Sequence, residues 1–105
     1  MYDYEKTEPR QPDLAYFGSK AGTKEVSSLS GLLAAPVPLM LVNAELDPLA
    51  FFAQGNLLND ALCARGRCPR RLVLKGHSHM SEVYAINTSD RSLAGPLLDF
   101  VKVGR

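Results

Sequence analysis

The stretch "PLMLVNAELDPLAFFAQGNLLNDALCARGRCPRRLVLKG", residues 38–76, decides the predicted fold. It opens with a continuous apolar run at residues 39–42 and closes with a second short apolar run at residues 72–74. Uninterrupted apolar runs of this length are typical of strands that are buried on both faces of a parallel sheet. We therefore expect two buried strands here.

The segment between the two runs reads as a helix. Pro48 suits the first helical position, and Gly66 suits the position just after the last turn. Helical spacing places three large apolar side chains on one face of this segment: Phe51, Leu58 and Leu62. Strand, helix and strand in this order predict a right-handed β-α-β unit, the building block of an α/β sheet.

The rest of the chain frames this unit. Residues 1–28 are polar and irregular in pattern and predict a flexible lead-in, whereas residues 29–105 form the structured part. After the second strand, a closing helix is indicated by apolar residues at helical spacing, with Gly95-Pro96 expected to kink or restart it: Leu93, Leu97, Phe100 and Val101. Two strands make an incomplete sheet, so the fold class is a β-α-β-α portion of a larger α/β fold.

Composition limits the classes of function. A chain of 105 residues fits one domain. A formal net charge of +1 does not indicate binding to nucleic acid or to an anionic membrane. The N-terminal residues contain no apolar core of a signal peptide and the chain contains no apolar run of membrane-spanning length, so we expect a cytoplasmic protein. Cys63 and Cys68 are read as two reduced thiols, with a local disulfide as the alternative.

Acidic and imidazole side chains follow the two predicted strands. Glu45 and Asp47 come after the first strand, and His77 and His79, the only two histidines, come after the second. A right-handed crossover brings the carboxyl ends of both strands to one edge of the sheet, where ligands bind in open α/β folds. A carboxylate that orients a histidine supplies two of the three members of a nucleophile triad.

Each of these residues also has a simpler interpretation. Asp47 before Pro48 fits the N-cap of a helix, and either histidine fits a loop residue whose nitrogens bond to the backbone. A metal site built from Asp47, His77 and His79 is a third interpretation, but no further histidine cluster supports it, and we expect neither a metal nor a cofactor. What favours catalysis is the conjunction of an acid and a histidine at one sheet edge.

The segments "NAELDP" and "KGHSHMSE", followed by "SLAGPLLDFV", resemble the C-terminal part of an α/β-hydrolase of the esterase/lipase or carboxylesterase kind. The resemblance covers roughly residues 29–101. It implies that Asp47 is the triad acid, with Glu45 the weaker candidate. It also implies that His79 is the base, with His77 as the alternative, and that the substrate is a small-molecule ester.

The sequence departs from that family in one important respect. It contains no G-x-S-x-G nucleophile elbow and no H-G-G loop, and in these enzymes the serine precedes the acid and the histidine. We therefore read the chain as a C-terminal fragment of a serine-type carboxylic-ester hydrolase. The alternative is a non-catalytic interaction or regulatory remnant of the same fold. An open strand edge also predicts possible self-association.

The missing nucleophile generates the first prediction. The isolated chain should show no stoichiometric acylation by a fluorophosphonate probe, because such probes label an activated serine. Intact-protein mass spectrometry checks this. One covalent adduct per chain would contradict the fragment interpretation.

Overall fold

The computed structural model describes Tyr2, Asp3, Gln11, Ala15 and residues 27–104. Most of the predicted lead-in therefore lies outside the described residues. The chain divides into two compact units at Pro36. In the first unit, the described structure is the short helix α3, Leu29–Ala34, whose first backbone N–H donates to the carbonyl of Tyr2 at 3.0 Å.

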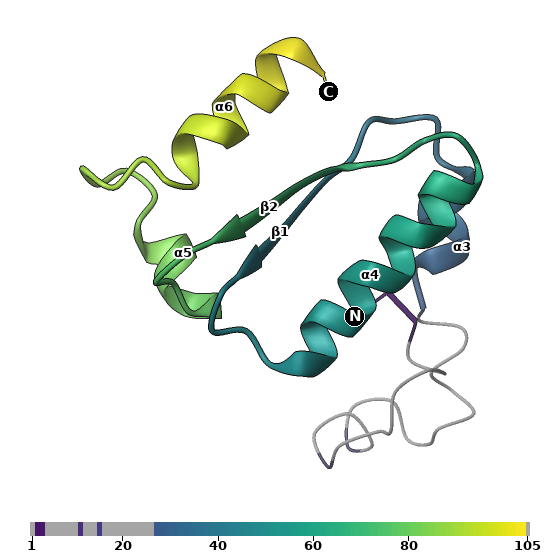
Figure 1. Cartoon of the computed structure of the whole chain (residues 1–105), viewed down its shortest axis with the longest axis horizontal. Coiled ribbons are helices and arrows are strands. Elements are labelled where there is room, and N and C mark those ends of the chain that lie inside the picture. The colour runs from purple at the N-terminus through teal and green to yellow at the C-terminus, as the bar shows by residue number, and fades with distance from the viewer. Residues whose placement is uncertain (1, 4–10, 12–14, 16–26, 105) are drawn as a thin grey trace. The chain divides into compact units, whose positions relative to one another are not determined.

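The second unit, residues 37–105, contains the predicted β-α-β order (Figure 1). Strand β1 (Met40–Ala44) is followed by helix α4 (Leu49–Ala64) and strand β2 (Arg70–Leu74). The two strands are parallel and pair in register from Met40 with Arg70 to Ala44 with Leu74. The described protein is thus a mixed α/β structure whose sheet has two strands.

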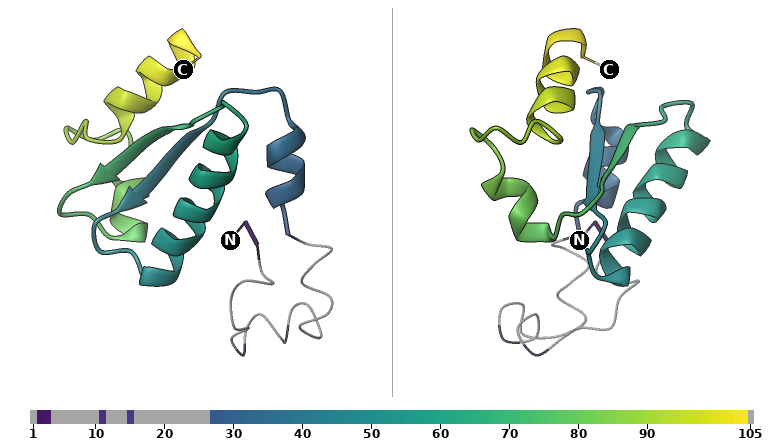
Figure 2. Two further views of the ribbon diagram at one scale, coloured as in Figure 1. Left: turned by 45° about the vertical axis from the view of Figure 1, so that its right-hand side comes forward. Right: turned by 60° about the vertical axis from the view of Figure 1, so that its left-hand side comes forward.

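Two further helices follow β2: α5, His79–Tyr84, and α6, Ala94–Val103. Figure 2 shows α4 on one side of the sheet and α5 with α6 on the other. The apolar core is small and is centred on β1, α4 and the end of β2. Its main members are Leu41, Ala44, Leu58, Leu62 and Leu74.

The expectation that both strands are buried on both faces is wrong for β2. Leu74 is the only buried residue of β2. Arg70 and Arg71 are exposed, and Val73 is 48% exposed to solvent. The physical reason is cover: in the described part of the chain, α4 and α5 pack mainly against β1, so β2 has less cover on its faces. β1 fits the expectation better, because Leu41, Asn43 and Ala44 are buried.

Helix α4 approaches β1 so closely that a side chain at Gly55 would be tight against Asn43. A Cβ added at Gly55 would lie 3.0 Å from Oδ1 of Asn43 and 3.6 Å from Nη2 of Arg71. Asn43 is buried, and its amide contacts the Asp47 carboxylate at 3.4 Å. The glycine in the middle of α4 therefore lets the helix lie against a polar side chain that also supports the candidate site.

The end of α4 is fixed by its backbone and by a disulfide. Gly66, at a φ of 71°, donates to the carbonyl of Cys63, and the Arg67 N–H reaches the carbonyl of Leu62, both at 2.9 Å. These two bonds make the Schellman arrangement that satisfies the last helical carbonyls. Cys63 and Cys68 are joined by a disulfide across the same turn, so the interpretation as two reduced thiols is wrong in this structure.

Helix α6 differs from the expected closing helix. Gly95 and Pro96 lie in its first turn, where the missing N–H of proline needs no helical partner, so they neither kink nor restart it. Leu93, the residue before the helix, is buried at 8% exposure, but no residue within α6 is buried, and Val101 is 70% exposed. The apolar residues do lie in a helix, as predicted, but no other described segment buries the apolar side chains of α6.

The close contact at Gly55 gives a stability prediction. Gly55→Ala should lower the melting temperature, because overpacking against Asn43 costs ~1–3 kcal/mol and outweighs the gain of about 1 kcal/mol in helix propensity. Gly95→Ala is the matched control: nothing lies within 4 Å of its added Cβ, so it should be neutral or stabilising. Thermal melts followed by circular dichroism compare the two. A Gly55→Ala protein as stable as the control would contradict the close contact.

Candidate active site

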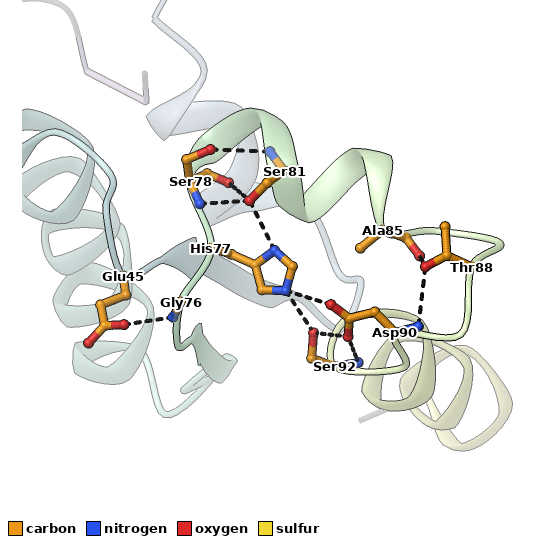
Figure 3. A network of polar contacts seen from close by, with 9 residues as sticks. All are labelled: Glu45, Gly76, His77, Ser78, Ser81, Ala85, Thr88, Asp90 and Ser92. Atoms are coloured by element: carbon orange, nitrogen blue, oxygen red, sulfur yellow. Dashed lines mark hydrogen bonds and ion pairs between the residues drawn. The ribbon is translucent and has the colours of Figure 1, made fainter.

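The turn after β1 and the segment after β2 are held together by three hydrogen bonds. The Glu45 N–H donates to the carbonyl of Leu74 at 2.9 Å, and the Leu46 N–H donates to the carbonyl of His77 at 3.0 Å. The third bond runs the other way, from the Gly76 N–H to the Glu45 carboxylate at 2.7 Å (Figure 3). The two loops at this sheet edge therefore form one unit.

The position of Asp47 is set by the turn that ends β1. Its backbone N–H donates to the carbonyl of Ala44 at 3.1 Å, and its Oδ2 accepts the Ala44 N–H at 3.0 Å and an Asn43 amide N–H at 3.4 Å. The side chain is only 2% exposed. The simpler interpretation of Asp47 as an N-cap is wrong: Pro48 occupies that position, with no side-chain cap, and the carboxylate faces β1 and His79.

His79 was expected in a loop, but it is the first residue of α5. Ser78 is the N-cap: its hydroxyl accepts the Ser81 N–H at 3.3 Å, and the Ser81 hydroxyl accepts the Ser78 N–H at 2.8 Å. This reciprocal arrangement is a capping box, which satisfies two of the free N–H groups at a helix start. The box fixes where the helix begins and so where the His79 ring lies.

Asp47 and His79 meet across the sheet edge. Nδ1 of His79 lies 3.1 Å from Oδ1 of Asp47, and the Phe51 ring stands edge-on to the imidazole with centroids 4.9 Å apart. Since a carboxylate oxygen only accepts, Nδ1 donates to Asp47, and in the neutral imidazole Nε2 then keeps its lone pair. The His79 side chain is 58% exposed. The pair thus combines a buried, oriented acid with an imidazole whose outer nitrogen no described residue bonds.

His77 is placed quite differently (Figure 3). Its Nδ1 lies 3.0 Å from the Ser81 hydroxyl, and its Nε2 lies 2.8 Å from Asp90 and 3.2 Å from the Ser92 hydroxyl. The ring is 14% exposed, and both of its nitrogens are occupied. His77 therefore ties the segment after β2 to the loop between α5 and α6, and it has no free nitrogen for proton transfer.

The bonds at Asp90 strengthen this tie. Hydrogen bonds from the hydroxyl and the backbone N–H of Ser92 lower the pKa of the Asp90 carboxyl, and His77 adds to the same effect. Asp90 therefore stays ionised and keeps accepting from His77. The Ser81 hydroxyl, which contacts Nδ1 of His77, also accepts the Ser78 N–H in the capping box.

The remaining sequence candidates are also accounted for. Glu45 contacts Gly76 and neither histidine, so it is not the partner acid of an imidazole here. Among the described residues, no group of three or more His, Cys, Asp or Glu side chains is arranged to hold a metal ion. The structure thus brings together Asp47 and His79 and separates them from His77 and Glu45.

Glu82 belongs to this site, and sequence reasoning missed it. It lies three residues after His79 in α5, is 8% exposed, and its Oε2 has no hydrogen-bond partner among the described residues. Burial and the negative charge of Asp47 raise the pKa of Glu82 above its ordinary value of 4.5, while His79 and His77 lower it by less. Its spacing from His79 in a short helix is the signal that could have found it.

Glu82 gives a prediction with a defined sign. An acid whose pKa is raised by folding costs stability once it ionises, and that cost vanishes as the pH falls toward the unfolded value of 4.5. Glu82→Gln stays neutral, so it should melt at a higher temperature than the wild type at pH 7, and the gap should close toward pH 4.5. Melts across this range measure it.

The control for this prediction is Glu45→Gln. It also removes one negative charge at the same sheet edge, but Glu45 is exposed and accepts the Gly76 N–H, so it should not stabilise the protein. An equal gain in both variants would show that the overall charge, rather than the burial of Glu82, is responsible.

Comparisons with known proteins add no further constraint. No protein-family model matches the sequence, and the search of curated proteins finds no match. None of the helices in the described part of the chain is long and apolar enough to cross a membrane. The observations that bear on function are therefore the sequence motifs and the geometry of Asp47 and His79.

Proposed function

We propose that this chain carries the acid and the general base of a serine-type carboxylic-ester hydrolase. The observation that carries the proposal is the Asp47–His79 pair, with 3.1 Å between Oδ1 and Nδ1 and with the outer face of the imidazole exposed. A buried carboxylate on one imidazole nitrogen and a free second nitrogen are what a proton shuttle requires. The resemblance of "NAELDP" and "KGHSHMSE" to esterases and lipases supports the same assignment.

In the proposed reaction, each residue has one role. Nε2 of His79 takes the proton from a serine hydroxyl as that oxygen attacks the ester carbonyl, and later gives the proton to the departing alcohol. Asp47 holds the Nδ1–H tautomer and stabilises the imidazolium that forms in between. Water then hydrolyses the acyl-serine: Nε2 takes a proton from the attacking water and gives it to the serine oxygen as the carboxylic acid leaves.

The serine is supplied by a polypeptide segment that this sequence does not contain. The 105 residues include no G-x-S-x-G, and Ser81, whose hydroxyl lies 3.0 Å from Nδ1 of His77, has no contact with His79, the proposed base. The proposal therefore concerns an incomplete catalytic site. This chain supplies the acid and the base at the sheet edge, and the nucleophile comes from another segment. The substrate class is a small-molecule ester, and the reaction needs no metal or cofactor.

The decisive test begins with the transcript upstream of the Met1 codon. An in-frame G-x-S-x-G, with an H-G-G-type loop before it, is expected. The protein extended to include it should hydrolyse p-nitrophenyl esters, and His79→Gln should lower kcat/KM by about 10⁶-fold, as the loss of a triad histidine does. The loss should appear in kcat, because the proton transfer belongs to the transition state.

His77→Gln is the matched control. Its nitrogens tie two loops together and do not face the open side of the pair, so its effect on kcat should be far smaller than that of His79→Gln. If a stop codon lies directly upstream without a serine elbow in frame, or if the two variants lose activity equally, the proposal fails. The non-catalytic interaction remnant would then be the better hypothesis.

A further inference from the structure

The loop between α5 and α6 contains the triplet Asn87-Thr88-Ser89. Asparagine, then any residue except proline, then serine or threonine is the acceptor sequence for N-linked oligosaccharides in secreted proteins. No other asparagine of the chain has serine or threonine two positions later. Such triplets also occur in proteins that carry no sugar, so what matters is how the loop presents this one and in which environment the chain folds.

The loop leaves the two chemically important side chains of the triplet free and uses the middle one to hold its shape (Figure 3). The Thr88 hydroxyl donates to the carbonyl of Ala85 and accepts the Asp90 N–H at 3.2 Å. Asn87 and Ser89 are exposed, and no hydrogen bond joins either side chain to another described residue. A large polar group attached at Asn87 would therefore break no contact of the folded loop.

The backbone at Asn87 also suits an acceptor site. Its φ is 65°, in the left-handed region that asparagine tolerates better than most residues. The triplet lies outside both helices, since α5 ends at Tyr84 and α6 begins at Ala94. Residues two positions apart do not face each other on a helix, whereas a turn allows the Asn87 amide and the Ser89 hydroxyl to engage one enzyme together.

The disulfide between Cys63 and Cys68 is an independent observation that favours the same modification. Disulfides form and persist in oxidising compartments and are rare in the cytosol. Proteins that fold in such compartments are those that meet the enzyme that transfers N-linked oligosaccharides. The disulfide lies at the end of α4 and the triplet lies between α5 and α6, so neither feature is a structural consequence of the other.

We propose that Asn87 is an N-glycosylation site and that the protein folds in an oxidising, secretory compartment. The donor is a lipid-diphosphate-linked oligosaccharide, and an oligosaccharide transferase catalyses the step. The side-chain nitrogen of Asn87 attacks the anomeric carbon of the first sugar and forms the N–C bond. The bond from that carbon to the diphosphate oxygen breaks, the lipid diphosphate leaves with the electron pair, and one amide proton passes to a base of the transferase.

This inference goes beyond the proposed function and does not depend on it. It also differs from the cytoplasmic location that the composition of the sequence predicts. A glycan at Asn87 and free thiols at Cys63 and Cys68 would be opposite indications, so the location and the modification can be tested together.

The first test brings the chain to the transferase. The 105-residue chain is translated behind a cleavable signal peptide in the presence of endoplasmic-reticulum microsomes. A slower-migrating product is expected, protected from added protease by the vesicle membrane and returned to the unmodified mobility by N-glycosidase F. A chain that enters the microsomes and stays unmodified would overturn the inference.

Three variants make this test specific. Ser89→Ala should abolish the modification, because it removes the acceptor sequence while leaving Asn87 and its backbone in place, and Ser89→Thr should retain it. Asn56→Gln changes an exposed asparagine outside any such triplet and should be modified like the wild type. Equal modification of Ser89→Ala and the wild type would show that the sugar is not on Asn87. Asn87→Gln is less suitable, because glutamine tolerates a φ of 65° less well.

The second test examines the protein from the cells that express it. Trypsin cleaves after Lys75 and Arg91, and the resulting peptide, residues 76–91, contains Asn87 as its only asparagine. N-glycosidase F in heavy-oxygen water converts a glycosylated asparagine into labelled aspartate. Label at position 87 is expected, together with an intact disulfide. Unlabelled Asn87, or free thiols at Cys63 and Cys68, would overturn the inference whatever the microsomes show. Neither test measures ester hydrolysis, so both succeed or fail independently of the proposed function.

Discussion

The candidate site depends on the parallel pairing of β1 with β2 and on the three hydrogen bonds that continue it beyond the strand ends. Ala44 pairs with Leu74, and the next bonds join Glu45 and Leu46 to the segment that leads into α5. Because the two segments are fixed to each other, residues 32 positions apart in the chain meet as an acid and a base. Without this strand register, the side chains of Asp47 and His79 would not lie within hydrogen-bonding distance of each other.

Three polar side chains are buried at this edge of the sheet, and they differ in whether their hydrogen-bonding atoms have partners. Asn43, Asp47 and Glu82 are all nearly inaccessible to solvent in a small domain that can bury only a few apolar side chains. Asn43 and Asp47 bond to each other, and Asp47 also bonds to the backbone, whereas Oε2 of Glu82 has no hydrogen-bond partner in the part of the chain that the structure describes. This imbalance, and not the fold itself, is what singles out Glu82.

The two histidines illustrate how neighbouring residues of one type can do different work. His77 uses both nitrogens to connect the start of α5 with the loop before α6, and its partner Asp90 is kept ionised by Ser92. His79 uses one nitrogen and exposes the other side of its ring. Although the two histidines are only two residues apart, the side chain of His77 is mostly buried, whereas that of His79 is mostly exposed.

The sequence by itself determined the β-α-β order, the turn that carries Asp47, and the location of both histidines after the second strand, because apolar runs, Pro48 and Gly66 are local signals. It could not determine the exposure of β2, which depends on what lies beside a strand, or the disulfide, which depends on distance and not on spacing. It ranked Asp47 above Glu45 only through a family resemblance, and it did not detect Glu82. Only the tertiary structure decided these points, since hydrogen bonding and desolvation depend on groups that the chain brings together from distant positions.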